Sequence, residues 1–347
     1  MRIIKKISAS EMFSPLLILI LILTFALILQ PGFLSVGFRD GRFTGNLIDI
    51  LNRSVPVMIL AMGMTLVIAT GGADLSVGAI VVITSAASIA LIRGDTIDPT
   101  NSTAMHLFWV VLLTIGVGII CGLWNGFLVA KIGMQPVVAT LILMVAGRGI
   151  AQNITRERSL TTGYLRFGEI ANGFTLGIPN ACWIALCVFL LFWFFTRKTA
   201  FGLFIESVGI NKSAANHAGI RATLILIIIY ALSGFCGSIT GIIGASNVLV
   251  VEPMNTGQNM ELDAIVSVVL GGTSMRGGKF NLGGSCIGAI ILMALTKTMY
   301  SFGVPVEFAL FVKAIVVVIV VLIQSPVTQK FISSRIKTKK GEVAVNG

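Results

Sequence analysis

Long apolar runs alternate with short polar segments along almost the whole chain. A helix needs about 20 apolar residues to cross the hydrocarbon core of a bilayer, and most of these runs are close to that length. The pattern therefore predicts an all-α polytopic membrane protein. We expect about ten membrane-spanning helices, at 13–31, 55–71, 75–92, 106–130, 134–151, 180–196, 221–245, 261–272, 281–300 and 304–324.

Two of these expected spans need comment. The eighth, 261–272, is short and glycine interrupts its end, so its boundaries stay open. The first resembles a signal peptide, because Arg2, Lys5 and Lys6 precede an apolar run. No small-residue cleavage site follows that run, so we expect it to stay in the protein as the first span.

Basic residues predict the orientation of the spans. With the N-terminus in the cytoplasm, most of the 25 Lys and Arg fall on the cytoplasmic side, where the positive-inside rule places them. We therefore expect both termini to be cytoplasmic. The predicted organisation is a cytoplasmic N-terminus at 1–12, a transmembrane domain at 13–324 with a cytoplasmic loop at 197–221, and a basic cytoplasmic tail at 325–347.

Composition supports the membrane assignment and excludes other classes. The chain is 56% hydrophobic and 11% charged, whereas soluble domains carry about 25% charged residues. The net charge of +11 gathers at the ends of apolar runs, so it indicates a membrane rather than nucleic acid. The 5 cysteines form no CxxC pair, and we expect small buried hydrophobes and no metal site. No catalytic set is present, so the chain is not expected to be an enzyme.

The polar segment 197–221 is the most informative part of the chain. Asn211 is placed to cap a short helix over 212–218, and Gly219 is placed to end that helix in a left-handed turn. Ala214 and Ala215 would give the helix a small, smooth face, and Glu206 lies just upstream. Two interpretations stay open: a docking surface for a partner, or a solvated connecting loop.

A second polar point interrupts the apolar pattern at residues 71–76. Gly71 and Gly72 break the second span, and Asp74 and Ser76 are placed to cap the next helix. A carboxylate is favoured at a helix N-terminus by the helix dipole. Asp74 is therefore interpreted either as a cap alone or as part of the transport pathway or its gate. Lys313, central in its span, is a further candidate for the pathway, as are Lys297 and Arg148 near span ends.

Small residues repeat at four-residue spacing in three of the expected spans. These ladders are Gly118/Gly122/Gly126, Ser233/Gly237/Gly241 and Gly284/Gly288. Each ladder places small side chains on one helix face, which lets the backbones of two membrane helices approach closely. We expect helix packing along these three faces.

Three strings carry a resemblance to a known family. They are Glu206–Ile220 (ESVGINKSAANHAGI), Met62–Gly78 (MGMTLVIATGGADLSVG) and Gly271–Asn281 (GGTSMRGGKFN). They resemble the bacterial ABC sugar-importer permeases of the ribose, xylose and galactose type, and the likeness extends over about residues 46 to 325. Within that family the motif sequences are most similar to those of the galactofuranose-importer permeases. The chain departs from the family pattern at Ser207 and Ala73, where Ala and Ile are usual.

The resemblance implies a function and a set of partners. It implies that the chain has the permease fold. It also implies that the chain is the membrane-spanning subunit of a binding-protein-dependent ABC importer, which moves a monosaccharide through the bacterial inner membrane. A partner ATPase would dock on the loop that contains Glu206, Gly209, Asn211, Ala214, Ala215 and Gly219. A sugar-binding protein and a second permease copy complete the assembly, and which sugar is carried stays open, with galactofuranose as the candidate.

Two further points limit this interpretation. The glycine-rich string at 271–281 lacks the spacing of a phosphate-binding loop, since Phe280 follows Lys279, so ATP is expected to bind the partner and this chain to hold no cofactor. The alternative function is a stand-alone secondary transporter or channel for a small polar solute. Such a transporter would be expected to carry carboxylates within its spans, and Asp74 is the main one here.

Overall fold

A computed structural model describes residues 12–93 and 105–305, together with single positions between 308 and 318. It divides into two compact units, Met1–Ala294 and Leu295–Gly347, and the following description concerns the first. The helices are α2 (Phe13–Leu29), α3 (Asn46–Ala69), α4 (Val77–Arg93), α5 (Leu107–Phe127), η1 (Leu128–Ile132), α6 (Pro136–Thr155), α7 (Leu165–Asn172), α8 (Asn180–Lys198), α9 (Phe201–Ile210), α10 (Lys212–His217), α11 (Ala222–Val248), α12 (Met260–Leu270) and α13 (Leu282–Ser301).

The helices largely follow the expected spans. Among the described residues, 6 helices are long and apolar enough to cross a membrane: Asn46–Ala69, Leu107–Ile132, Pro136–Thr155, Asn180–Lys198, Ala222–Val248 and Leu282–Ser301. α2 and α4 are apolar but have 17 residues each, and α12 has 11. More than half of the expected last span, 304–324, lies outside the described residues, and so do 1–11 and the tail at 325–347. The count of ten and the orientation therefore stay predictions.

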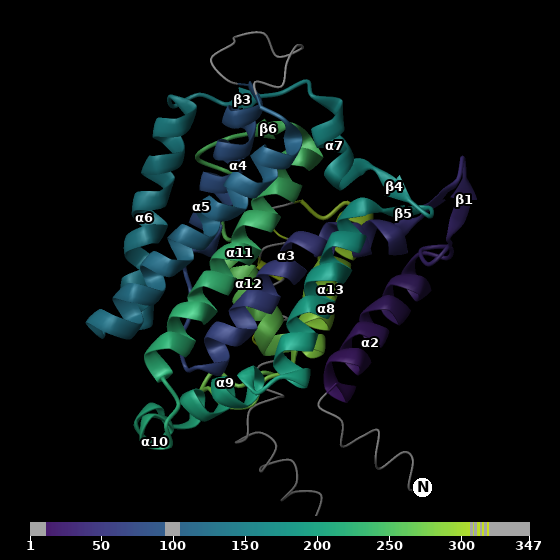
Figure 1. Cartoon of the computed structure of the whole chain (residues 1–347). Helices are drawn as coiled ribbons and strands as arrows, with labels where there is room; N and C mark the ends of the chain where they lie inside the picture. The colour runs from purple at the N-terminus through teal and green to yellow at the C-terminus, as the bar shows by residue number, and fades with distance from the viewer. Residues whose placement is uncertain are drawn as a thin grey trace, which may run out of the picture. The chain divides into compact units, whose positions relative to one another are not determined.

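Six short strands were not expected from the apolar pattern. They form three antiparallel two-stranded sheets: β1 (Gly37–Arg39) with β2 (Arg42–Thr44), β3 (Leu160–Thr161) with β6 (Val250–Val251), and β4 (Phe174–Thr175) with β5 (Ile178–Pro179). In Figure 1 these sheets lie at one end of α3, α8 and α11, and α9 and α10 lie at the other end. Strands of two or three residues fall below what periodicity in a sequence can detect.

α11 is the centre of the packing, and it contacts α3, α4 and α5. The α5 ladder meets it backbone to backbone: a methyl group at Gly122 would lie 2.2 Å from the Tyr230 carbonyl oxygen, and one at Gly118 would lie 2.6 Å from that of Gly234. Backbones this close are the result expected of small-residue ladders between membrane helices. The predicted packing along the α5 ladder is confirmed.

The other two ladders are confirmed in the same way. Gly237 and Gly241 on α11 face α4, where a methyl group at Gly241 would lie 2.1 Å from the Thr84 hydroxyl oxygen. Gly284 and Gly288 on α13 face the segment around α12, and a methyl group at Gly288 would lie 2.0 Å from the Ser267 carbonyl oxygen. These faces fix α4, α11, α12 and α13 at distances that larger side chains would not allow.

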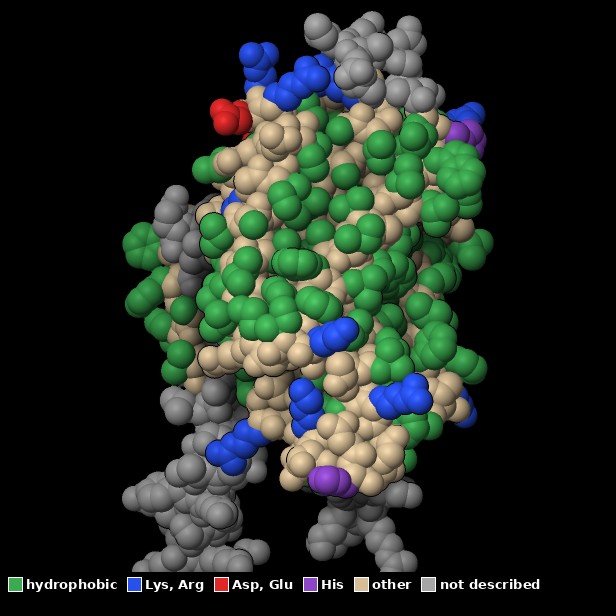
Figure 2. Space-filling view, turned by 60° about the vertical axis from the view of Figure 1, so that its left-hand side comes forward, with side chains coloured by type: hydrophobic (Ala, Val, Ile, Leu, Met, Phe, Trp, Pro, Cys, Tyr) green, Lys and Arg blue, Asp and Glu red, His purple; other side chains and the backbone are tan. Residues whose placement is uncertain are grey.

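The surface of the helices matches a lipid environment. Figure 2 shows hydrophobic side chains over the middle of one face, with most of the Lys and Arg side chains towards its two ends. Burial differs greatly among the long helices. In α3, 78% of the apolar stretch that could span the membrane is buried in the protein, against 22% for the helix Leu107–Ile132. α3 is therefore an inner helix, whereas α5 with η1 has a broad apolar face that only lipid or another protein can cover.

Candidate functional site

The segment 197–221 folds into two helices with a sharp corner between them. The Asn211 side-chain oxygen accepts a hydrogen bond from the Ala214 backbone N–H at 3.0 Å, which caps α10. Gly219 ends the helix with φ +85°, a left-handed conformation that favours glycine. The cap and the stop predicted from the sequence are both confirmed. Ala215 faces inward and is buried, whereas Ala214 is exposed.

The first of these two helices, α9, was missed in the sequence. Its Ile205 and Val208 are 0% and 3% exposed and pack into the core, while Glu206 is half-buried. The segment had been interpreted as polar because charged residues flank it, although residues 201–210 themselves are mostly apolar. Packing of one apolar face, more than local composition, stabilises a short helix of this kind.

Gly209 brings α9 against the end of α3 with no space for a side chain. A methyl group at Gly209 would lie 1.9 Å from the Ala69 carbonyl oxygen and 2.7 Å from the Gly278 nitrogen. The Gly278 N–H donates a hydrogen bond of 2.8 Å to that same Ala69 oxygen. A methyl group at Gly277 would lie 3.0 Å from the Gly71 nitrogen. We call Ala69, Gly71, Gly209, Gly277 and Gly278 the glycine junction.

The glycine junction joins the three strings that the sequence singled out. They come from α9, from the end of α3, and from the turn that precedes α13, where Gly277 and Gly278 have φ +83° and +92°. Positive φ at both positions explains why the turn uses glycine. Segments more than 60 residues apart therefore meet here at backbone atoms.

A few residues beyond Gly71, a buried polar cluster surrounds Asp74. Asp74 is 0% exposed, and its Oδ1 accepts from the Ser76 backbone N–H at 3.0 Å and from the Ser76 hydroxyl at 2.6 Å. Its Oδ2 accepts from the Ser233 hydroxyl on α11 at 2.7 Å. The Asn125 amide on α5 donates to the Ser76 hydroxyl at 2.7 Å. We call Asp74, Ser76, Asn125 and Ser233 the polar cluster.

The polar cluster links the turn into α4 to two other helices. Asp74 bonds Ser76, the residue just before α4, rather than a donor inside that helix, and it ties this turn to α11 through Ser233. The link to α5 runs from Asn125 to the Ser76 hydroxyl. The partners of Asp74 among the described residues are neutral hydroxyl and backbone groups.

Two polar atoms beside this cluster are buried without a hydrogen bond in the described part of the chain: Asn125 Oδ1 and the Tyr230 hydroxyl. Tyr230 is fully buried on α11, and its hydroxyl lies 2.9 Å from where a methyl group at Gly72 would stand. Gly72 therefore leaves room for the tyrosine ring. Within the same described residues, no group of three His, Cys, Asp or Glu side chains is placed to hold a metal ion.

The sequence prediction of this region was incomplete. Gly71, Gly72, Asp74 and Ser76 do lie together, as expected. Ser233 had been noted only as part of a packing ladder, and Asn125 and Tyr230 had no assigned role. The available signal was a polar side chain inside an apolar span, as at Asn125 in LWNGF.

Of the charged candidates within the spans, Arg148 has a defined contact. Arg148 donates to the Met254 carbonyl oxygen at 3.0 Å and to that of Thr256 at 3.4 Å, so it holds the loop before α12. Lys297 belongs to the second unit. Lys313 lies outside the described residues.

The fold and this site together define a class of protein. Apolar helices enclose a buried polar cluster, and the short helix α9 meets the end of α3 through a glycine contact, so the chain is a multi-pass membrane protein with its polar chemistry inside the helix bundle. The chain belongs to the family described as the branched-chain amino acid transport system / permease component, whose model matches residues 46–321.

Curated relatives narrow the resemblance. The chain is 46% identical to the galactofuranose transporter permease protein of Escherichia coli (strain K12), over 92% of this chain and 90% of the relative. It is 38% identical to a fructose import permease protein of Bifidobacterium longum, over 97% and 94%. It is 33% identical to a ribose import permease protein of Haemophilus influenzae, over 88% and 90%. No solved structure gives a significant match. The resemblance to sugar-importer permeases found in the sequence is confirmed.

Proposed function

We propose that this chain is the membrane-spanning permease subunit of a binding-protein-dependent ABC importer that carries a monosaccharide into a bacterial cell. The observation that carries the proposal is the 46% identity to a galactofuranose transporter permease, along nearly the full length of both chains. Galactofuranose is accordingly the candidate sugar. ATP hydrolysis belongs to a partner ATPase, and this subunit supplies the path through the membrane.

Residues 197–221 are proposed as the surface on which the ATPase docks. α10 has a defined end at each side, through Asn211 and Gly219, and it exposes small side chains such as Ala214. A short, rigid helix with a small-residue face fits a groove in a partner. Glu206 and Gly209 lie on α9 within this surface, and Gly209 is also part of the glycine junction, so movement of the surface would reach the end of α3 directly.

The polar cluster is proposed as part of the transport gate. Asp74 holds the turn into α4 to α11, and Ser76 in the same turn accepts from Asn125 on α5. A change in the position of α3 would alter those hydrogen bonds. Gly71, Gly72 and Ser76 give this turn its shape and its room. Alternating access requires two arrangements of the same helices, and ligands favour one of them by binding it more tightly.

The remaining features of the assembly are part of the same proposal. Both termini face the cytoplasm, the transmembrane domain extends over 13–324, and the protein lies in the inner membrane. A binding protein delivers the sugar from outside, and two permease copies form the pore. A single-cysteine variant at Ser213, in a background without the native cysteines, tests the orientation: an impermeant reagent added outside intact cells is expected not to label it.

The transport function is tested by uptake of labelled galactofuranose in cells that lack their own importer. The chain is expressed with its ATPase and binding protein, and the control carries an ATPase that cannot hydrolyse ATP. We expect uptake only with the active ATPase. Equal uptake with the inactive ATPase would favour a stand-alone transporter. Uptake of labelled ribose or fructose but not galactofuranose would keep the class of protein and correct the sugar.

A further inference from the structure

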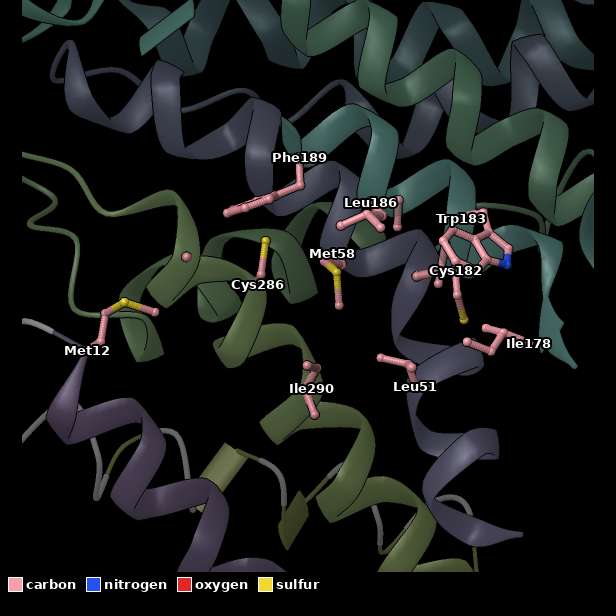
Figure 3. Close-up of a pocket in the computed structure, with 13 residues that line it drawn as sticks. Met12, Leu51, Met58, Ile178, Cys182, Trp183, Leu186, Phe189, Cys286 and Ile290 are labelled. Carbon is pink, nitrogen blue, oxygen red and sulfur yellow. The ribbon is translucent and has the colours of Figure 1, made fainter. Parts of the chain in front are cut away.

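A cavity of about 460 Å³ lies between α2, α3, α8 and α13 (Figure 3). Its volume is in the range of about 300–1,000 Å³ that holds small organic ligands. Aliphatic, aromatic and sulfur-containing side chains line it, among them Leu51, Met58, Cys182, Phe189, Cys286 and Ile290. The indole N–H of Trp183, at one end, already donates to the Thr175 carbonyl oxygen at 3.0 Å.

α2 contacts its neighbours at several points along its length. The second half of α2 is held by Ala26, which is fully buried with Phe33, Ile50 and Ala294. At its beginning, the Met12 side chain reaches α13, where its methyl carbon is 2.9 Å from the position of a methyl group built at Gly283. Between these two points the space beside α3 and α8 is not filled by side chains.

The lining excludes polar occupants. A sugar would lose its hydrogen bonds to water and find almost no polar partner here, and each unpaired polar group makes its burial unfavourable. Water is disfavoured too, since it needs about 2–4 polar partners to stay in a buried site. An empty space would forfeit the dispersion contacts of all the side chains around it. Hydrocarbon is the occupant that satisfies all three conditions.

The cavity is also continuous with the surface that faces lipid. Leu186 lines the cavity and is 43% exposed, and Leu190 and Phe194 continue the same exposed apolar face of α8 at 51% and 53%. α3, α8 and α13 are three of the helices with the length and composition of membrane spans. An acyl chain can therefore enter sideways from the bilayer without crossing a polar region.

We propose that this cavity binds one acyl chain of a bilayer phospholipid. The chain completes the packing between α2 and the helices α3, α8 and α13, so that part of the wall of this unit is lipid rather than protein.

Trp183 provides a direct probe of the occupant. Trp109, Trp124 and Trp193 are each more than 40% exposed and are replaced by Phe, which leaves Trp183 as the one tryptophan. The protein is reconstituted in vesicles of phosphatidylcholine with or without bromine on its acyl chains. Bromine quenches an indole only at contact, so we expect strong quenching of Trp183 in the brominated vesicles.

A matched pair of variants on α8 separates cavity lipid from the surrounding lipid. Cys182 lines the cavity and Cys187 is exposed outside it, so each is replaced by Phe. We expect Cys182→Phe to reduce the quenching by about half, because the ring occupies the space that an acyl chain fills. Cys187→Phe should leave it unchanged. Gly283→Leu fills the cavity from its other end and serves as a second filling variant if Cys182→Phe does not fold.

Three outcomes would overturn the proposal. Absence of quenching in the parent protein would mean that lipid does not reach the cavity and that a protein segment fills it. Equal quenching in the parent and in both filling variants would assign the signal to lipid outside the cavity. Equal loss in Cys187→Phe would show a general effect of the added ring.

Discussion

The glycine junction and the polar cluster hold neighbouring residues of one stretch, 69–76, by opposite means. At the junction, Ala69 and Gly71 meet α9 and the turn before α13 through backbone atoms, and no side chain intervenes. In the cluster, Asp74 and Ser76 meet α5 and α11 through side-chain hydrogen bonds. The contact at the junction depends on close packing of backbone atoms, and the contact in the cluster depends on hydrogen bonds between side chains.

This difference has a consequence for movement. A backbone contact at van der Waals distance transmits displacement in full, because compressing it is costly. A hydrogen-bonded carboxylate has discrete alternatives, because its hydroxyl partners can rotate to other acceptors. We infer that the junction passes on motion from α9, and that the cluster responds by changing partners.

The largest expected effect comes from adding one methyl group at the junction. Gly209→Ala places a carbon where the Ala69 carbonyl oxygen would be only 1.9 Å away. α9 must then move away from α3, and we expect a loss of about 3 kcal/mol in the free energy of unfolding together with loss of uptake. Thermal unfolding of the purified protein and sugar uptake measure the two effects.

Gly149→Ala is the matched control. Gly149 is also in a helix, but a methyl group there would meet nothing within 4 Å. Alanine is the better helix residue by roughly 0.5–1 kcal/mol, so this variant should be neutral or slightly more stable. If Gly209→Ala behaved like Gly149→Ala, the junction would not be a tight contact.

The next effect separates the charge of Asp74 from its hydrogen bonds. Asp74→Ala leaves the hydroxyl groups of Ser76 and Ser233 without their acceptor, and we expect a loss of about 1–3 kcal/mol in the free energy of unfolding. Asp74→Asn keeps an acceptor oxygen of the same shape, so its stability should stay near that of the parent.

For a gate that depends on the charge, Asp74→Asn should still lose uptake. We expect a loss of about tenfold in uptake, equivalent to about 1.4 kcal/mol, because the neutral amide lacks the negative charge on which such a gate depends. Uptake is measured at equal amounts of assembled protein in the membrane. Near-normal uptake by a well-expressed Asp74→Asn would leave Asp74 a structural role only.

The comparison also shows how far the sequence could predict the site. The three segments that form the site were each recognised in the sequence, because glycine and capping residues are local signals for turns and helix ends. That Gly209 meets Ala69 and Gly278 could not be deduced, because the contact joins segments far apart in the chain and glycine has no side chain to indicate its neighbour. Ser233 and Asn125 show a related limit: a hydroxyl or amide within an apolar run indicates a polar contact but not its partner.

The fold was also predictable where the signal is local and not where it depends on contacts between distant segments. Long apolar helices such as α3 and α11 were predicted because about 20 apolar residues leave few alternatives in a bilayer. α9 was missed, since a ten-residue helix between charged flanks depends on tertiary packing of Ile205 and Val208. The apolar cavity beside α2 was likewise not predictable, because its lining residues come from segments far apart in the chain.

A smaller effect is expected at the edge of the polar cluster. Ser233→Ala removes one of the three donors to Asp74 and leaves the other two, both from Ser76, in place. We expect a loss of about 1 kcal/mol in the free energy of unfolding. Ser238→Ala, also on α11, is the control, since the Ser238 hydroxyl bonds only its own helix, at the Phe235 carbonyl oxygen. Equal losses in both variants would argue against a special role for the link to Asp74.

The smallest effect tests whether the proposed docking surface must be rigid. Asn211→Ala removes the cap of α10, which is worth about 1 kcal/mol, whereas Asn211→Ser keeps a capping oxygen. The cap stabilises only this exposed helix and shares no hydrogen bond with the polar cluster. The free energy of unfolding of the whole protein should therefore hardly change. Co-purification of the ATPase should instead fall for Asn211→Ala and stay normal for Asn211→Ser. If the ATPase were retained equally by both variants, an ordered α10 would not be needed for docking, and the contact would have to depend on α9 alone.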